Sequence, residues 1–291
     1  MLFQAMSVHP QLWSLYRESQ PILSKHFPLA LEPGASSVVR AADVGEATQA
    51  EIEQEFFDQV GNVEGGSALL SRGLPLILRN RLSGRLQRLG AARKTPPIRI
   101  VEKTPDNCFR LNLLERVFPD ALYLYVLREA QGSIASIYHG WKDESRFRRY
   151  QLPAGFTIKG YDGDQWCFGV PPGWEDMDGA ALMEVCAFQW RAYNEFCLQD
   201  LPDDPDRVMQ VRYEELSSRP GPVLDAIASW AQVDPAPFRR FAKKLPVVNT
   251  WTKPREDKWR RVEDELTPVL EQVRPMSERL GYGDAGFSPG A

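Results

Sequence analysis

Three short runs of apolar residues stand out along a chain whose hydrophobic positions otherwise recur with helical spacing. They span residues 97–101, 121–127 and 207–212, and turn-forming or charged residues bound each of them. The middle run barely alternates between apolar and polar positions, as is typical of a strand covered on both faces in a parallel sheet. The pattern therefore predicts three strands set among helices.

A helical pattern joins the first two of these strands. Residues 107–118 place Leu111, Leu114, Val117 and Phe118 on one face of a helix. Strand, helix and strand within about 30 residues form a βαβ unit, because parallel strands need a crossover connection of this kind. The order of elements therefore predicts an α/β fold.

The remaining helical stretches occupy most of the chain outside the strands. They are expected over residues 47–60, 68–89, 180–201, 222–231, 235–245 and 256–280. Pro268 and Pro275 fall inside the last stretch, and because proline lacks a backbone donor we expect the helix to be broken there. Residues 142–178 are rich in Gly, Pro, Trp and Tyr without a clear period, as in a lid or binding loop. We find no repeat or linker and expect a single domain over residues 1–291.

Composition and charge restrict the possible partners. The 291 residues are 43% hydrophobic and 25% charged, as in an ordinary globular protein. Thirty-five Lys and Arg against 39 Asp and Glu give a net charge of −4, which argues against a protein that coats nucleic acid or anionic lipid. The longest apolar run, residues 121–127, is far shorter than the roughly 20 residues of a membrane span. With no secretory signal visible after Met1, we expect a cytoplasmic protein.

The four cysteines predict neither a metal site nor a disulfide framework. Cys108, Cys167, Cys186 and Cys197 share no C-x-x-C spacing, and the chain has only three histidines. Cys186 and Cys197 lie about three turns apart on one predicted helix, too far to bridge each other. We expect buried, reduced thiols and no bound metal.

The most informative segment follows the first predicted strand. Glu102 and Lys103 lie at the carboxyl end of that strand, where open α/β sheets bind their ligands. Thr104 and Pro105 come next in the pattern of a helix cap and a first helical position. The alternative is that Glu102 and Lys103 form only a surface charge pair beside the cap.

The end of the second predicted strand carries a second candidate. Arg128 ends this strand, and Ser136 follows eight residues later in the next helix. The two converge on one anion if the chain turns back after the strand, and the guanidinium fork and helix amino terminus both suit a phosphate. The alternative is an arginine that pairs with a nearby carboxylate and a serine that caps a turn.

Taken in order, these segments resemble the sulfotransferases that use 3′-phosphoadenosine 5′-phosphosulfate (PAPS). The matching pieces are Glu102 to Pro105 with Asn107, Phe118-Pro-Asp-Ala121, Arg128 with Ser136, Val211-Arg-Tyr-Glu-Glu-Leu216, Thr252-Lys253 to Lys258-Trp259-Arg260, and Leu280-Gly-Tyr282. Residues 2–10 also resemble the helix that follows the family's first phosphate loop. The resemblance spans nearly the whole chain and implies a three-layer α/β/α fold with a central parallel sheet in the P-loop-like topology of these enzymes.

The resemblance also implies roles for the donor-binding residues. Arg128 and Ser136 would bind the 3′-phosphate of PAPS, and Tyr213 would lie near the adenine; a core aromatic at a strand end is the alternative for Tyr213. Lys253, with Thr252 beside it, would lie in the loop that closes over the same phosphate. Thr252 stands where several family members have arginine.

For catalysis, Glu102 matches the base of the carbohydrate-modifying branch, and Lys103 would neutralise charge near the transferred group. His139 is the alternative base. The implied reaction moves the sulfuryl group in line from PAPS to a hydroxyl or amine and leaves 3′-phosphoadenosine 5′-phosphate (PAP), without a metal. Catalysis is then positioning, charge stabilisation and removal of one proton.

The resemblance implies an acceptor that carries a hydroxyl group and is a small molecule, a sugar, a lipid or a peptide. The aromatic segment at 142–178 would stack on it, or would pack into the domain's own core. The basic run at 142–149 is a solvated face, or else Arg146, Arg148 or Arg149 meets an anionic acceptor.

The beginning of the chain departs from the family pattern. The family's first strand and its glycine-rich phosphosulfate loop have no counterpart before Leu2. Either the segment lies upstream of Met1, or the protein is a degenerate nucleotide- or partner-binding member of the same fold without catalysis. We expect these 291 residues to bind donor weakly and to turn over slowly.

Overall fold

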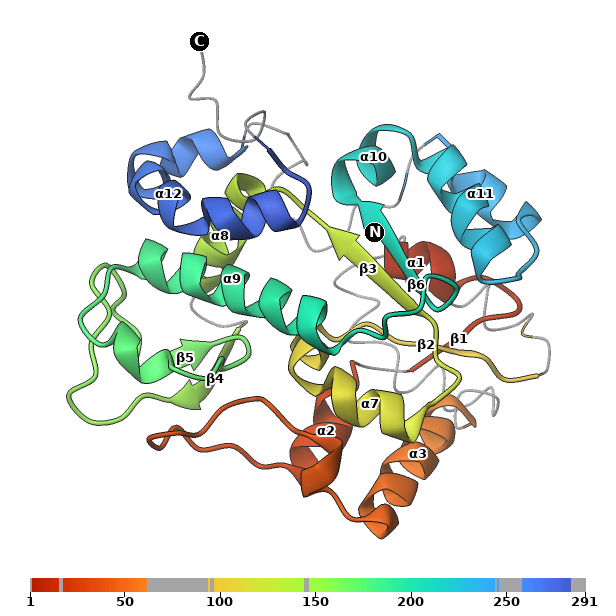
Figure 1. Cartoon of the computed structure of the whole chain (residues 1–291), viewed down its shortest axis with the longest axis horizontal. Coiled ribbons are helices and arrows are strands. Elements are labelled where there is room, and N and C mark those ends of the chain that lie inside the picture. The colour runs from red at the N-terminus through yellow and green to blue at the C-terminus, as the bar shows by residue number, and fades with distance from the viewer. Residues whose placement is uncertain are drawn as a thin grey trace.

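Helices and short strands alternate along the chain, as the sequence predicts. The computed structural model describes residues 2–15, 18–61, 94, 97–143, 147–243, 245 and 258–283. The helix expected at 68–89 lies outside these ranges. In the described ranges, α-helices and 3₁₀ helices surround short two-stranded ribbons, of which two are parallel and one is antiparallel (Figure 1). This arrangement makes the protein an α/β protein.

The described strands form three two-stranded ribbons. The pairs are β1 (Trp13–Ser14) with β2 (Ile100–Val101) in parallel, β3 (Tyr123–Leu127) with β6 (Val208–Arg212) in parallel, and β4 (Arg148–Gln151) with β5 (Gln165–Cys167) antiparallel. All three predicted strands are present. Within the described ranges β2 and β3 are not paired with each other, so the expected βαβ unit connects two separate ribbons. β2 is short because Pro97 before it cannot donate to a ladder and a helical turn starts at Pro105 after it.

Helices cover both faces of the β3–β6 ribbon. Tyr125 and Leu127 pack into a core with α8 (Ala130–Trp141), α9 (Leu182–Asp200) and α12 (Glu263–Arg279). Leu124 and Val211 pack into a second core, with α1 (Leu2–Ser7), α10 (Tyr213–Ser218), α11 (Pro220–Trp230) and the 3₁₀ helix η4 (Ala236–Phe241). Figure 1 shows these two groups of helices on opposite sides of the ribbon. Both faces of β3 therefore carry apolar residues, as its weak alternation predicts, although Val126 is 39% exposed.

A third core lies under the amino-terminal helices and the crossover helix. Its elements are α2 (Gln20–His26), α3 (Glu46–Gly61) and α7 (Leu111–Val117), with the short turn η1 (Ala41–Asp43) beside them. The helix predicted over 107–118 starts as the 3₁₀ helix η2 (Pro105–Arg110) and becomes α-helical only at Leu111. Asp106 and Asn107 bond through their short polar side chains to Arg149 and Glu102, the kind of residue that disfavours a regular α-helix. The stretch predicted at 235–245 is likewise a 3₁₀ helix, η4.

The break expected in the last helix is wrong. α12 runs continuously through Pro268 and Pro275, and the 3₁₀ turn η5 (Lys258–Val262) precedes it. Leu266, Val269 and Val273 are fully buried against α8 and α9. This packing offsets the backbone hydrogen bonds that the two prolines remove.

The described part of the 142–178 segment packs into the core. It contains β4, β5 and the 3₁₀ helix η3 (Trp174–Met177), so it is more regular than its sequence predicts. Trp166 lies between Trp141 and Trp174, with ring centroids 5.2 and 5.9 Å away. The side chains of all three are almost completely buried. Of the two interpretations of this segment, packing onto the domain's own core is the one that the described residues follow.

Gly140 allows α8 to approach that aromatic layer. A Cβ atom at this position would lie 2.3 Å from Cζ of Phe168, whose ring stacks on Phe147 at 4.7 Å. We expect Gly140→Ala to lower the free energy of unfolding by about 1–2 kcal/mol, because overpacking outweighs the better helix propensity of alanine. Urea denaturation followed by circular dichroism measures this. Gly45→Ala, whose new methyl group would meet nothing within 4 Å, is the control; an equal effect of both changes would contradict the prediction.

None of the helices in the ranges given above is both long enough and apolar enough to cross a bilayer.

Candidate functional site

The first candidate cluster lies where the β3–β6 ribbon ends. Leu127 pairs with Arg212 in the parallel register, so Arg128 and Tyr213 leave the ribbon side by side. The Arg128 guanidinium carbon lies 4.6 Å from the centroid of the Tyr213 ring, and Nη1 donates to the Ser136 hydroxyl at 3.0 Å. The structure thus brings together three residues that the sequence predicted as donor ligands. We call Arg128, Ser136 and Tyr213 the Arg128 cluster.

The Arg128 cluster is accessible and keeps its positive charge available. Arg128 and Tyr213 are half-buried and Ser136 is exposed. Across the described ranges, no carboxylate lies within ion-pair distance of Arg128, and its Nε is buried without a hydrogen-bond partner. The alternative in which Arg128 serves an internal ion pair is therefore not observed among these residues. α8 begins two residues later, at Ala130, and its N-cap residue Glu129 makes no side-chain cap hydrogen bond.

Gly132 leaves room for the Arg128 guanidinium. A Cβ atom on Gly132 would lie 2.8 Å from Arg128 Nη2 and 2.8 Å from a carboxylate oxygen of Glu129. The end of a flexible side chain moves at little cost, so Gly132→Ala should displace the guanidinium from Ser136 without destabilising the fold. We expect affinity for a phosphorylated nucleoside to fall about tenfold, with a melting temperature at or above that of the parent because alanine favours helix.

Isothermal titration with PAP, together with a thermal scan, checks this prediction. Ser133→Ala, on the same helical turn, is the control. If Gly132→Ala bound PAP as tightly as the parent, the space beside residue 132 would not determine the position of the Arg128 guanidinium.

The second candidate is the Glu102 carboxylate, which follows β2 directly. Its Oε1 accepts hydrogen bonds from the Ser19 backbone N–H at 3.0 Å and from the Thr104 hydroxyl at 2.5 Å. Its Oε2 accepts one from the Asn107 amide at 2.7 Å. The side chain is half-buried, and these bonds fix its orientation between the loop before α2 and the turn η2. Oε2 retains a lone pair for a further donor.

Two expectations about the neighbours of Glu102 change. Thr104 stands at the cap position of η2, but its side chain makes no cap hydrogen bond and its hydroxyl donates to Glu102 instead. Lys103 forms an ion pair with Glu18, and both side chains are about half exposed, at 48% and 43%. Lys103 therefore lies in a surface ion pair, but its partner is Glu18 and not Glu102.

A buried ion pair supports the turn that carries Asn107. Arg149 donates to Asp106, whose side chain is only 1% exposed. The Tyr193 hydroxyl lies 3.4 Å from the same carboxylate and accepts from the Gly169 N–H at 2.9 Å. Arg149 is thus paired with Asp106 within the protein. Sequence reasoning missed this pair because nothing in the spacing of Asp106 and Arg149 links them.

The other basic residues of that stretch have different surroundings. Arg148 lies 5.8 Å from the Tyr161 ring, and Arg146 lies outside the described ranges. Nearby Arg110 is 3% exposed and donates to Gln20 at 2.8 Å. Burial lowers the pKa of Arg110, and the Asp106 carboxylate opposes this shift.

The end of α12 returns to the Arg128 cluster. Arg212 donates to the Gly281 carbonyl at 2.9 Å and lies 4.4 Å from the centroid of the Tyr282 ring. Glu214 joins the two sides, because it accepts from the Tyr282 hydroxyl at 2.8 Å and from the Glu129 N–H at 3.2 Å. Burial, followed by the Glu214 contact, raises the pKa of Tyr282, so it stays a neutral donor. Sequence reasoning missed Glu214, although it adjoins the predicted Tyr213.

The remaining predicted site residues are placed only in part. Thr252 and Lys253 lie outside the described residues. His139 is exposed in the last turn of α8, with its ring 5.9 Å from that of Tyr138. Within the part of the chain that the structure describes, no group of His, Cys, Asp and Glu side chains could hold a metal ion.

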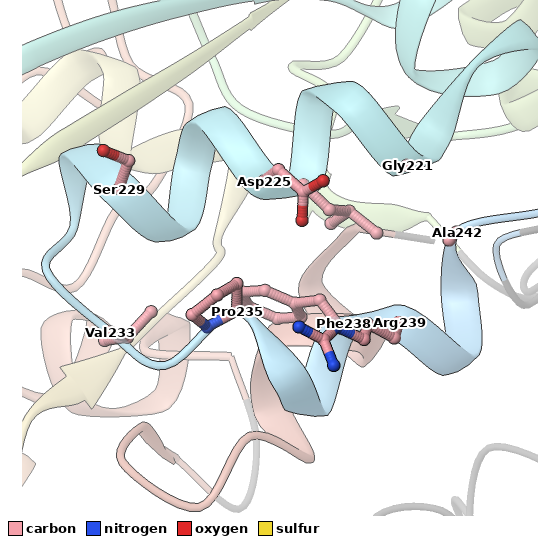
Figure 2. A pocket seen from close by; sticks show the side chains of 9 residues that line it. Gly221, Asp225, Ser229, Val233, Pro235, Phe238, Arg239 and Ala242 are labelled. Carbon is pink, nitrogen blue, oxygen red and sulfur yellow. The ribbon is translucent and has the colours of Figure 1, made fainter.

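A cavity of about 490 Å³ lies away from both clusters, between α11 and η4 (Figure 2). Its walls include Leu224 and Phe238, with Asp225 and Arg239 at its polar rim. None of the predicted site residues lines it.

Comparison with known proteins finds similarity among solved structures but not among family models or curated sequences. No family model matches the chain, and no curated protein sequence is similar to it. Among solved structures, a sulfotransferase domain from the curacin biosynthetic pathway is similar over 91% of this chain and 92% of its own, with 15% identity and a TM-score of 0.38. A score of this size does not define a shared fold, so the functional argument rests on the residues.

Proposed function

We propose that the protein is a PAPS-dependent sulfotransferase that transfers the sulfuryl group to a hydroxyl or amine of an acceptor and releases PAP. The observation that carries this proposal is the meeting of Arg128, Ser136 and Tyr213 at the paired ends of β3 and β6. A guanidinium with no carboxylate partner among the described residues, an exposed hydroxyl and an aromatic face are what a phosphorylated adenosine requires. In this proposal the parallel ribbons belong to the central sheet of the three-layer sulfotransferase topology.

The family resemblance supplies the roles of the chain's own residues, and the geometry of the Arg128 cluster supports those of Arg128, Ser136 and Tyr213. In this proposal Arg128 and Ser136 bind the 3′-phosphate and Tyr213 lies along the adenosine. Thr252 and Lys253, which lie outside the described residues, are assigned to the same phosphate by the resemblance alone. PAPS supplies the sulfuryl group, whose bond to the leaving phosphate breaks as the bond to the acceptor oxygen forms. Glu102 takes the proton of the acceptor hydroxyl on Oε2, which has one hydrogen-bond donor against two on Oε1.

Titration calorimetry with two nucleotides tests the donor site. PAP and 5′-AMP differ by the 3′-phosphate, so we expect PAP to bind at least tenfold more tightly and Arg128→Met to abolish the difference. Arg219→Met removes the same charge from an exposed position and is the control. Equal affinities of the parent for the two nucleotides would refute the donor assignment.

A second candidate is a nucleotide-binding protein of the same fold without catalysis. It is favoured by the partners that the proposed catalytic pair already has, since Glu102 accepts three hydrogen bonds and Lys103 is bound to Glu18. Transfer of ³⁵S from labelled PAPS to a panel of hydroxyl and amine acceptors distinguishes the two. PAP binding without any labelled product would establish the second candidate.

A further inference from the structure

Cys108 and Cys197 lie in one apolar cluster between two facing elements. Cys108 belongs to η2 and Cys197 to the last turns of α9, and these two elements pack together. Both cysteines are in one small apolar cluster with Phe109. Both are free thiols in the structure. A disulfide between them would bring the two sulfur atoms to about 2.05 Å.

The two thiols differ in their access to solvent. Cys108 is 8% exposed, whereas Cys197 is only partly buried. Burial raises the pKa of Cys108 well above its ordinary value, and contact with Cys197 adds to the shift. Cys197 is therefore the thiol that a molecule in solution reaches first, and Cys108 is placed to react second.

The pair adjoins the Glu102 site. Cys108 comes directly after Asn107, whose amide donates to Glu102, and Asp106 before them holds Arg149. The Phe109 ring packs on Tyr193 of α9 with centroids 4.9 Å apart, so η2 already rests on that helix. A covalent bond between η2 and α9 would fix the turn that orients the Glu102 carboxylate.

We propose that Cys108 and Cys197 form a reversible disulfide that locks η2 to α9 when a low-molecular-weight disulfide such as oxidised glutathione is present. The Cys197 sulfur attacks one glutathione sulfur, the S–S bond breaks, and one glutathione thiol leaves. The Cys108 sulfur then displaces the second glutathione and loses its proton. Two protein thiols are oxidised to one disulfide, and oxidised glutathione is reduced to two molecules of the thiol.

Cys167 and Cys186 provide an internal comparison. They lie near each other, and the side chains of both are completely buried in the core between β5 and α9. Burial raises the pKa of each thiol. A solution disulfide reaches neither, so both stay reduced under conditions that oxidise Cys108 and Cys197.

Peptide mapping of the full chain after incubation with oxidised glutathione tests this. Trypsin cuts after Lys103 and Arg110 and after Arg191 and Arg207, so residues 104–110 and 192–207 each carry one cysteine. We expect these two peptides to be joined, two hydrogens lighter than their sum, and released by dithiothreitol. Cys108→Ser should instead retain glutathione on Cys197, and Cys186→Ser should cross-link like the parent.

Any other pattern overturns the proposal. The proposal is refuted if the parent keeps glutathione on Cys197 while Cys108 stays free, or if neither cysteine reacts. It is also refuted if a cross-link forms through Cys167 or Cys186. Hydrogen exchange of residues 104–110 should slow in the oxidised protein, and unchanged exchange would refute the locking of η2. Both measurements are made without nucleotide, so their outcome is independent of the proposed sulfotransferase activity.

Discussion

Glu102→Gln is expected to reduce turnover by about 10²–10⁴-fold and to leave PAP affinity unchanged, because glutamine cannot take the proton of the acceptor hydroxyl. The substitution keeps the size of the side chain and an oxygen that accepts from Ser19 and Thr104. Asn107 can turn its amide to accept from the new NH₂ group. The change therefore tests basicity alone. Initial rates with labelled PAPS give the turnover, and titration calorimetry gives the affinity.

Two further variants separate the role of Glu102 from other causes. Glu18→Gln removes a nearby surface carboxylate that pairs with Lys103 and should keep turnover within about twofold of the parent. His139→Asn tests the alternative base. Full activity of Glu102→Gln together with a large loss in His139→Asn would transfer the role of base to His139.

The Arg128 cluster could be predicted because its geometry is local to two strand ends. Arg128 and Tyr213 each come next after a strand of the same direction, and parallel strands end at the same edge of a sheet. Ser136 lies two turns along the following helix, from which it reaches back to Arg128. Short-range rules were enough for Arg128 and Ser136, whereas Tyr213 was predicted from the family resemblance.

The surroundings of Glu102 could not be predicted in this way. Its bond to Ser19, like the pairing of Lys103 with Glu18, joins residues more than 80 positions apart that no periodicity connects. The cap expected from Thr104 failed for a related reason, since a carboxylate brought near by the fold competed for the hydroxyl. α12 shows the same limit, because burial of one helical face overrode two prolines. Local propensity identified the elements, while tertiary contacts decided the partners of their polar side chains.

Arg149→Met is expected to lower the free energy of unfolding by about 3 kcal/mol, because it leaves the Asp106 carboxylate charged and buried without its ion-pair partner. Asp106 is 1% exposed, and its other hydrogen bond among the described residues is the long one from Tyr193, at 3.4 Å. This loss of stability lies at the lower end of the range for broken buried ion pairs, because Arg149 itself is 24% exposed. Urea denaturation followed by circular dichroism measures it.

The origin of this cost can be separated from simple loss of packing. Arg148→Met, on the same strand, removes a guanidinium that has no ion pair within the described ranges and should cost less than about 1 kcal/mol. Adding Asp106→Asn to Arg149→Met removes the unpaired charge and should restore more than half of the lost stability. Equal costs for Arg148→Met and Arg149→Met would mean that the pair contributes no net stability. A double variant no more stable than Arg149→Met would mean that the unpaired Asp106 charge is not the origin of the lost stability.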